Sequence, residues 1–457
     1  MKSFGLFNRK IENILPGRVL TDREDLVCYG FDASSREGMP LAVVKPDDTN
    51  DVSKVAAHAF ENNHPIVPRG AGTGMTGGSV PLKNAIILSL EGMNEIIDID
   101  EKNMIACVEP GVINGHLQER LEEKGLFYPP DPASMKFCTL GGNVAENAGG
   151  PRAVKYGVTK DYVLGLETVL PHGRVLNTGG KNYKDVVGYD LTRLMVGSEG
   201  TLGVITKIFL KVLPLPEEVT TLLCTFSKLD EAAQVVSSIT SSSIIPRTLE
   251  IMDHESIRAI ENYKKHGLPL DADALLLIEV DGSHAAVSHD AEKIADICAS
   301  HNGKVSVADD IYSRNRIWEA RRSISQALYS IKPSKINEDI VVPRGRVPEM
   351  LAELKRIADQ YNLIIANFGH AGDGNIHVNI MTDKNDKEEY EKAKKAVRDI
   401  FEATVKLEGT ISGEHGIGLT KKEFIDMELS EVSIKLMKEV KSVFDPKGIM
   451  NPGKIFP

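Results

Sequence analysis

The sequence has few cysteines, and their spacing excludes several kinds of site. There are five, an odd number, and no two form a Cys-x-x-Cys pair. This pattern suits neither a disulfide framework nor an iron–sulfur cluster, so we expect reduced thiols. A protein of this kind that transfers electrons needs a carrier other than an iron–sulfur cluster of its own.

Long apolar runs and an excess of positive charge are also missing. No apolar stretch reaches the roughly 20 residues that a membrane helix needs, and residues 1–17 lack the apolar region of an export signal. Lys and Arg number 54 against 65 Asp and Glu, a formal net charge of −11, which argues against a general nucleic-acid-binding protein. We expect a cytoplasmic protein, which a partner could hold at a membrane. A homodimer is compatible with the sequence.

With 457 residues, the chain is too long for one hydrophobic core. Up to Leu213, short strand-like runs alternate with glycine-rich turns, and residues 51–62 have a helical pattern that follows the polar pair Thr49-Asn50. The expected strands in this part cover residues 41–46, 65–68, 85–90, 105–109, 163–170 and 202–212.

After the Leu213-Pro-Leu-Pro216 break, helical periods alternate with strands, as is typical of an α+β domain. The expected helices cover residues 230–242, 286–302, 347–361 and 389–408, and the expected strands cover 274–281 and 363–367. We therefore predict domains over residues 1–216 and 217–410, and a C-terminal segment over 411–457 that returns to the first domain.

The glycine-rich run Gly72–Gly77 matches the G-x-G-x-x-G pattern of dinucleotide-binding Rossmann domains. That fold requires a helix between the glycines and the next strand. Only residues 78–84 are available before the strand, and Pro81 in their middle prevents a helix. The loop 69–78 could instead wrap a diphosphate with its backbone N–H groups, or be a plain surface loop. Two further glycine-rich loops, at 141–150 and 197–203, favour a phosphate-bearing cofactor.

Four motifs occur in the order found in the vanillyl-alcohol-oxidase/PCMH-type flavoproteins, and the chain resembles that family from about residue 40 to its C-terminus. The subgroup it resembles most contains the glycolate oxidase FAD subunit, D-lactate dehydrogenase and D-2-hydroxyglutarate dehydrogenase. The motifs are Pro68-Arg-Gly-Ala-Gly-Thr-Gly74, Pro129-Pro-Asp-Pro-Ala-Ser134, Gly141-Gly-Asn-Val-Ala-Glu-Asn-Ala-Gly-Gly150 and Gly197-Ser-Glu-Gly-Thr-Leu-Gly203.

The resemblance implies an α+β protein in which two subdomains hold FAD and an α+β cap domain covers the flavin. Many relatives attach FAD through a histidine of the first glycine loop, but residues 69–80 contain none, so non-covalent FAD is expected. By matching motifs, the residues expected at FAD are Pro68, Arg69, Gly70, Ala71, Gly72, Thr73, Gly74, Ser79, Pro132, Ser134, Gly142, Asn143, Asn147, Gly149, Gly150, Tyr156, Glu199, Gly203, Ile205 and Asn451.

Two histidines and a glutamate lie in glycine-rich turns of the C-terminal half. His370 and His377 flank a Gly-Asp-Gly turn, and Glu414 lies in the loop 411–418. Two imidazoles and a carboxylate can bind Zn²⁺, Mn²⁺ or Fe²⁺, although the histidines could equally be structural. The matching residues of the resembled family bind a divalent metal. His415 should project away from its neighbour Glu414. It suits a general base, the role of the matching family residue, or a supporting histidine.

A 2-hydroxy acid substrate brings a carboxylate, which arginine binds best. Arg321, in a helical stretch over 317–328, matches the substrate-binding arginine of the resembled family, whereas Arg322 is expected to be solvated. Ser325, one turn along, and Lys335 could supplement Arg321.

The sequence therefore predicts an FAD-dependent dehydrogenase that oxidises D-lactate or glycolate, with D-2-hydroxyglutarate as the alternative substrate. Electrons would pass to an iron–sulfur subunit, an electron-transfer flavoprotein or a quinone. A non-catalytic flavin subunit is the main rival. A flavin-free metallohydrolase leaves the glycine loops unexplained, and an acyl-transfer hydrolase lacks the G-x-S-x-G nucleophile motif.

Overall fold

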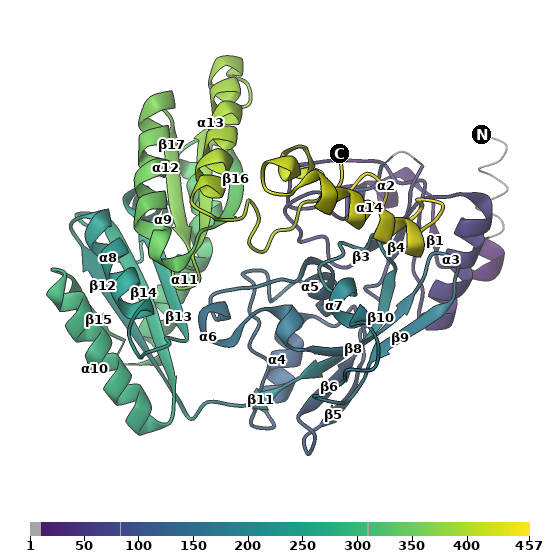
Figure 1. The fold of residues 1–457 in the computed structure, drawn as a ribbon, viewed down its shortest axis with the longest axis horizontal. Helices are drawn as coiled ribbons and strands as arrows, with labels where there is room; N and C mark the ends of the chain where they lie inside the picture. Colours follow the sequence, from purple (N-terminus) through teal and green to yellow (C-terminus); the bar gives the residue numbers. More distant parts are fainter. Residues whose placement is uncertain (1–10, 83, 309) are drawn as a thin grey trace. The chain divides into compact units, whose positions relative to one another are not determined.

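The computed structural model describes residues 11–82, 84–308 and 310–457, and its contacts divide the chain into two compact units (Figure 1). The first unit comprises the described residues up to Gly149 together with 158–215 and 414–457. The second comprises 150–157 and 216–413. The expectation of no export signal falls partly on residues 1–10, which lie outside the described residues.

The first glycine-rich loop connects two strands of one sheet in the first unit. Its strand order is β1-β2-β4-β3, and both β2 and β3 run parallel to β4. The strands are β1 (Val19–Leu20), β2 (Ala42–Val44), β3 (Ile66–Arg69) and β4 (Ile86–Ser89). The described residues between β3 and β4 contain no helix, which confirms that a Rossmann crossover is missing there.

The helix between β2 and β3, α3 (Thr49–Asn62), confirms the helical pattern that the sequence shows. Its capping residue differs from the expected polar pair, since helical backbone already begins at Thr49. The Asp48 side chain accepts a hydrogen bond from Asp51 N (2.8 Å). A carboxylate at this position satisfies an N–H that the first helical turn leaves unpaired.

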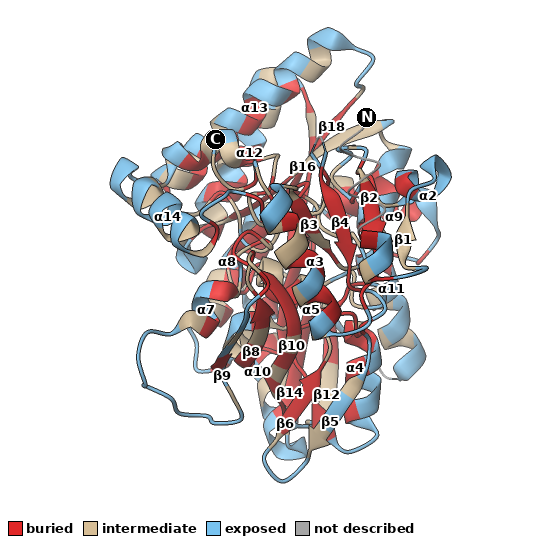
Figure 2. Cartoon of the chain, turned by 90° about the vertical axis from the view of Figure 1, so that its right-hand side faces the viewer, coloured by how far each residue is buried: buried red, intermediate tan, exposed pale blue. Residues whose placement is uncertain are grey.

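The second sheet of this unit is antiparallel and has the order β5-β6-β10-β8-β9. Apolar side chains of α3, such as Val52 and Val55, form one core with Ile86 of the first sheet and Val204 of the second. Figure 2 shows strands such as β4 and β10 as buried. The strands are β5 (Ile96–Asp100), β6 (Ile105–Val108), β8 (Val163–Val169), β9 (Val175–Gly179) and β10 (Val204–Lys211).

Shorter elements and the chain end complete the first unit. Ile66 N donates to Ile449 O (2.8 Å) and Asn451 N donates to Ile66 O (2.7 Å), so the C-terminal segment extends the edge of the first sheet. The remaining elements are α2 (Arg23–Cys28), α4 (Asn114–Glu122), β7 (Leu126–Phe127), α5 (Leu140–Glu146), α7 (Leu191–Met195), β11 (Leu213–Pro214) and α14 (Glu431–Phe444).

The second unit is built on one antiparallel sheet with the order β15-β12-β14-β13-β17-β18-β16. Its strands β14 and β17 confirm the two strands that the sequence predicts here. The strands are β12 (Glu218–Phe226), β13 (Thr248–Asp253), β14 (Ala274–Gly282), β15 (Lys304–Val307), β16 (Ser334–Val341), β17 (Ile364–Gly369) and β18 (Asn375–Thr382).

Helices contact this sheet in two groups. The helices α8, α10, α12 and α13 confirm the predicted helical periods and contact the strands and one another, whereas α9 and α11 pack together. Apolar side chains of α9 and α11 form a core with Met252, Leu277 and Phe368. The helices are α6 (Ala153–Tyr156), α8 (Leu229–Thr240), α9 (His254–Tyr263), α10 (His284–Ser300), α11 (Ile311–Ala327), α12 (Val347–Tyr361) and α13 (Lys387–Lys406).

Within the described ranges, no helix combines the length and the apolar character needed to cross a membrane.

Candidate active site

The three glycine-rich loops of the sequence line one cavity in the first unit. The first loop follows β3, the second lies in and after α5, and the third leads into β10. The residues expected at FAD that line this cavity are Pro68, Arg69, Gly70, Ala71, Gly72, Thr73, Gly74, Ser79, Pro132, Ser134, Gly142, Asn143, Gly149, Glu199, Gly203 and Ile205.

Two glycines of the first loop show why side chains are absent there. A Cβ at Gly70 would lie 2.1 Å from Thr139 Oγ1, and a Cβ at Gly72 would lie 2.1 Å from Arg69 Nη2. Gly72 also has a φ of +68°, which other residues rarely adopt. The backbone itself therefore forms this part of the cavity wall, as a site that wraps a diphosphate with N–H groups requires.

The second glycine motif is partly helical, which the sequence pattern did not predict. Thr139 caps α5, because its Oγ1 accepts a hydrogen bond from Gly142 N (3.2 Å). Gly141 tolerates no side chain, since a Cβ would lie 2.5 Å from Pro110 Cβ. Close packing thus explains why residue 141 is a glycine, whereas other glycines of this motif form part of the cavity wall.

Two glutamates line this cavity, and the sequence analysis found one of them. Glu199 accepts hydrogen bonds from Ile417 N and Gly418 N (2.8 Å each), and burial raises the pKa of its carboxyl. The other is Glu146, whose pKa is raised well above the ordinary value by burial and by the charge of Glu199.

Two buried polar atoms of the cavity residues, Glu146 Oε2 and Asn143 Nδ2, have no hydrogen-bond partner among the described residues. Buried polar atoms are normally paired, so these atoms suit a polar ligand. The glycine cradle and the unpaired amide and carboxyl therefore fit FAD, a cofactor with a diphosphate and many polar atoms.

Four residues expected at FAD do not line the cavity. Asn147 is the left-handed end of α5 and accepts a hydrogen bond from Lys160 N, and Asn451 Nδ2 donates to Gly78 O and Glu199 O. Gly150 and Tyr156 belong to the second unit, where the Tyr156 hydroxyl donates to Asp281 Oδ2 (2.8 Å). Their assignment to FAD stays a prediction.

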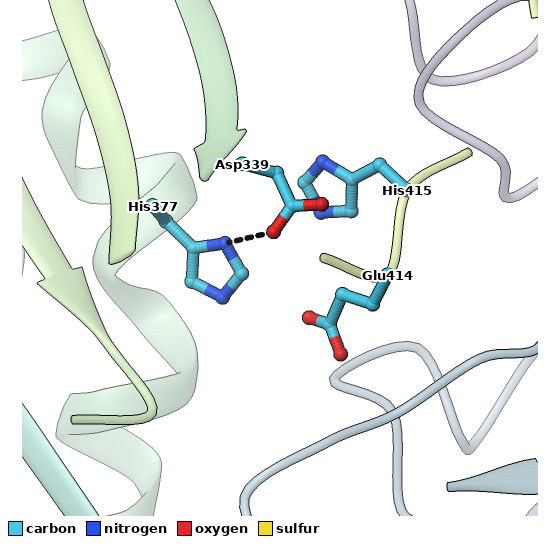
Figure 3. A group of neighbouring side chains, drawn as sticks. All are labelled: Asp339, His377, Glu414 and His415. Carbon is cyan, nitrogen blue, oxygen red and sulfur yellow. Dashed lines mark ion pairs between the residues drawn. The ribbon is translucent and has the colours of Figure 1, made fainter. Parts of the chain in front are cut away.

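Glu414 and His415 lie on the segment that returns to the first unit, and both line the same cavity. The Thr76 hydroxyl fixes this segment by donating to the His415 backbone oxygen (3.1 Å). Gly149 leaves room for the glutamate, because a Cβ there would lie 2.7 Å from Glu414 Oε2. Figure 3 shows the two side chains diverging, as expected for neighbours in the sequence.

The second unit holds a buried group of charged side chains on one sheet face. Glu250 of β13 is fully buried. Its Oε2 accepts a hydrogen bond from Nε of Arg321 in α11 (2.8 Å) and forms an ion pair with Nη2 of the same side chain (2.5 Å). Its Oε1 lies 2.6 Å from His370 Nδ1. Burial raises the pKa of Glu250, but its contacts with His370 and Arg321 outweigh burial and hold the pKa below its ordinary value.

The two histidines of the Gly-Asp-Gly turn approach each other. His370 follows β17, His377 lies on β18, and their Nε2 atoms are 3.4 Å apart. Two nitrogens bound at about 2.1 Å to one tetrahedral metal ion are separated by about 3.4 Å. The same separation also permits a weak hydrogen bond between the rings.

An aspartate on the edge strand stands behind His377. Asp339 of β16 pairs across the strands with His377, and its Oδ1 lies 3.7 Å from His377 Nδ1 (Figure 3). The same Oδ1 accepts from Asn375 Nδ2 (2.6 Å), and Oδ2 accepts from Gly413 N (3.0 Å). Each imidazole thus has a carboxylate on its Nδ1 side, as is usual for histidines that bind metals.

Glu250 and Asp339 were missed by the sequence analysis, although the sequence contains a signal for both. Glu250 lies within the strand-forming run Leu249–Met252, and Asp339 directly precedes the run Ile340–Val342. An acid buried between apolar strand residues is expected to be paired or to serve a site. That signal gives no partner, so it would have marked these residues without assigning a role.

Ser325 and Lys335, expected beside Arg321, contact each other in the second unit. Lys335 Nζ donates to Ser325 Oγ (2.8 Å) and to the Ser325 backbone oxygen (3.1 Å). Burial lowers the pKa of Lys335 to about 8. Ser325 lies one turn after Arg321 on α11, so the structure brings all three residues of the proposed carboxylate site to one helix and its neighbouring strand.

Comparison with known families identifies two parts of the chain. Residues 40–179 match the FAD binding domain family, and residues 215–455 match the family of FAD linked oxidases, C-terminal domain.

Curated relatives cover nearly the whole chain. The glycolate oxidase subunit GlcD of Bacillus subtilis (strain 168) is 47% identical over 430 residues, which cover 94% of this chain and 92% of that protein. The D-lactate dehydrogenase of Anaerostipes hadrus is 36% identical over 459 residues, covering 98% of this chain and 96% of that protein.

Solved structures agree on the fold. The structure of p-cresol methylhydroxylase with substrate bound has a TM-score of 0.84 at 19% identity, and covers 100% of this chain and 97% of that chain. This likeness confirms the predicted PCMH-type FAD-binding fold, and the family matches confirm FAD as the cofactor. The chain is a member of the FAD-linked oxidase family and an FAD-binding oxidoreductase.

Proposed function

We propose that this flavoprotein oxidises a small 2-hydroxy acid, glycolate or D-lactate, to the corresponding 2-oxo acid. The observation that carries the proposal is the buried group Arg321, Glu250, His370 and His377, which offers a carboxylate anchor beside paired imidazoles. The substrate class is supported by relatives named glycolate oxidase subunit and D-lactate dehydrogenase.

Each proposed role follows from the chemistry of the side chain. FAD, when bound, supplies the acceptor for the hydride that leaves the substrate Cα. Arg321 binds the substrate carboxylate through charge-assisted hydrogen bonds, supplemented by Ser325 and Lys335. His415 accepts the proton of the substrate hydroxyl, as an imidazole that acts as a general base can.

A divalent metal is part of the proposal, with His370, His377 and Glu414 as its ligands and Zn²⁺, Mn²⁺ or Fe²⁺ as the ion. The 3.4 Å between the two Nε2 atoms supports a shared ion, and so do the carboxylates on the Nδ1 sides. When bound, such an ion stabilises negative charge on the substrate oxygen as a Lewis acid.

The attachment of FAD and the fate of its electrons are also proposed. FAD is held without a covalent bond, because residues 69–80 contain no histidine. The cysteine spacing provides no iron–sulfur cluster in this chain, so the electrons pass to a partner. The partner is an iron–sulfur subunit, an electron-transfer flavoprotein or a quinone. The word subunit in the name of the Bacillus subtilis relative supports a complex of several chains. The cytoplasm is the proposed location.

The experiment is anaerobic mixing of the purified flavoprotein with glycolate, D-lactate or D-2-hydroxyglutarate, followed by its visible spectrum. Bleaching of the flavin band near ~450 nm by glycolate or D-lactate is the expected result. If D-2-hydroxyglutarate alone bleaches the flavin, it replaces glycolate and D-lactate as the proposed substrate. A yellow protein that no acid bleaches would contradict the proposal and favour a non-catalytic flavin subunit.

A further inference from the structure

Two side chains with different proposed tasks are held by the same buried carboxylate. Arg321, proposed for the substrate, and His370, proposed for the metal, both contact Glu250. We infer that Glu250 is a positioning residue that fixes the substrate anchor and the metal ligand together. The inference rests on the proposed function of these two partners and adds a residue to it.

The contacts on the arginine side fix the direction of the guanidinium. Nε and Nη2 of Arg321 both reach Glu250 Oε2, so one edge of the planar fork is occupied. The ring of Phe368 lies against the guanidinium, with its centroid 4.7 Å from Cζ. An arginine held by one edge and one face keeps little rotational freedom, which lowers the entropy lost when it binds a carboxylate.

The contact on the histidine side fixes the tautomer of the ring. A carboxylate oxygen 2.6 Å from His370 Nδ1 requires a proton on that nitrogen. The lone pair of the neutral imidazole then lies on Nε2, the nitrogen that faces His377. Glu250 thereby orients the ring and raises its basicity as a ligand.

The placement of Glu250 suits this double task. It lies on β13, two residues before Met252. Met252 pairs with Phe368 of β17, and Phe368 pairs with His377 of β18. Because alternate strand residues share a face, Glu250 and His377 lie on the sheet face that α11 covers. Glu250 is fully buried and lies within hydrogen-bond distance of both partners, so its removal would take a buried contact from Arg321 and from His370 at once.

A second buried glutamate on the same face provides a matched control. Glu279 of β14 accepts hydrogen bonds from Arg314 Nε (3.0 Å) and Trp318 Nε1 (2.7 Å), both on α11. It is nearly as buried as Glu250, and the partners of its carboxylate among the described residues, Thr221, Arg247, Arg314 and Trp318, include no histidine. Its loss should therefore destabilise the same helix without touching the proposed ligands.

The test measures metal affinity and substrate binding separately in Glu250→Gln and Glu279→Gln, with FAD bound. A chelator first removes any bound metal from the protein. Mn²⁺ alone is then added, and the electron-spin-resonance signal of the free ion gives the metal affinity. We expect Mn²⁺ to bind 10–100-fold more weakly to Glu250→Gln than to the unaltered protein. The KM for the oxidised hydroxy acid should rise by about tenfold or more, whereas Glu279→Gln should change neither value beyond about twofold.

Glu250→Asp covers the case in which Glu250→Gln does not fold. It keeps the charge but is one methylene shorter, so its carboxylate cannot reach both partners. Unaltered Mn²⁺ affinity and KM in this variant, or equal losses in Glu250→Gln and Glu279→Gln, would overturn the inference. Failure of the proposed function looks different, because the unaltered protein itself would then bind no Mn²⁺ or oxidise no hydroxy acid.

Discussion

The two units of this flavoprotein form their sites with different parts of the chain, the first with backbone and the second with side chains. In the first unit the FAD cavity is lined by glycine-rich backbone, and a Cβ at Gly70 would collide with Thr139. In the second unit Arg321, proposed for the substrate, and His370, proposed for the metal, are buried side chains that are both paired with Glu250. A cofactor with a diphosphate needs many N–H groups, whereas a small acid needs a few side chains held in fixed directions.

This difference decides how each unit should respond to substitution. A backbone cradle is blocked by added atoms, because the loop has nowhere to move. A network of paired charges is harmed by removed atoms, because a buried partner is left unsatisfied. The following substitutions test both statements.

The largest effect is expected at His415, the side chain of the first unit to which we assign proton transfer. His415→Asn should slow substrate-dependent flavin reduction by about 10²–10⁴-fold, since a positioned general base contributes that much. The FAD spectrum should not change, because the contact that fixes this segment uses the His415 backbone oxygen. Stopped-flow reduction checks this, with exposed His116→Asn as the control. An unaltered reduction rate would leave His415 a supporting histidine.

A side chain added to the first glycine loop should remove the cofactor. Gly70→Val places atoms within 2.1 Å of Thr139 Oγ1 and fills the cradle, so the affinity for FAD should fall about 100-fold, equivalent to ~3 kcal/mol. The ratio of flavin to protein after gel filtration measures this. Gly180→Val is the control, because a Cβ at Gly180 meets no atom within 4 Å. Equal flavin loss in both variants would contradict the cradle.

In the second unit, the pH dependence of substrate binding should depend on Lys335. Burial lowers its pKa to about 8, so the side chain is a cation below pH 8 and neutral above it. If the cation contributes about 1 kcal/mol to carboxylate binding, KM should rise about three- to fourfold between pH 7 and 9. Steady-state kinetics over this range check it. Lys335→Met should show a flat profile with the higher KM, and an unchanged pH dependence in that variant would exclude Lys335.

The smallest effect on function is expected at Tyr156, which the resemblance assigns to FAD. Its hydroxyl donates to the buried Asp281, which also accepts hydrogen bonds from Lys155 and Arg247. Tyr156→Phe should lower the free energy of unfolding by about 1.5 kcal/mol, with flavin content unchanged. Urea titration and the flavin ratio measure the two quantities. Flavin loss without destabilisation would instead support the assignment to FAD.

The sequence alone determined the features that contiguous residues encode. The glycine motifs, the lack of a helix in the described part of the segment between β3 and β4, and the helical period of α12 all depend on local backbone preferences, and the structure has each of them. The FAD-binding family was recognisable for the same reason, since a diphosphate cradle is a short run of backbone. The helix inside the second glycine motif was missed, because its stability comes from the Thr139 cap and not from propensity.

Only the tertiary structure decided which charges belong together. Glu250 lies 71 residues from Arg321 and 120 residues from His370 along the chain, and strand pairing brings the three into contact. No local pattern encodes such a pairing. The sequence shows only an acid, a base and an imidazole far apart along the chain, and their contacts follow from the register of β13, β17 and β18. Register is set by the whole sheet and its packing, so the network that orients the proposed active site is a property of the folded chain.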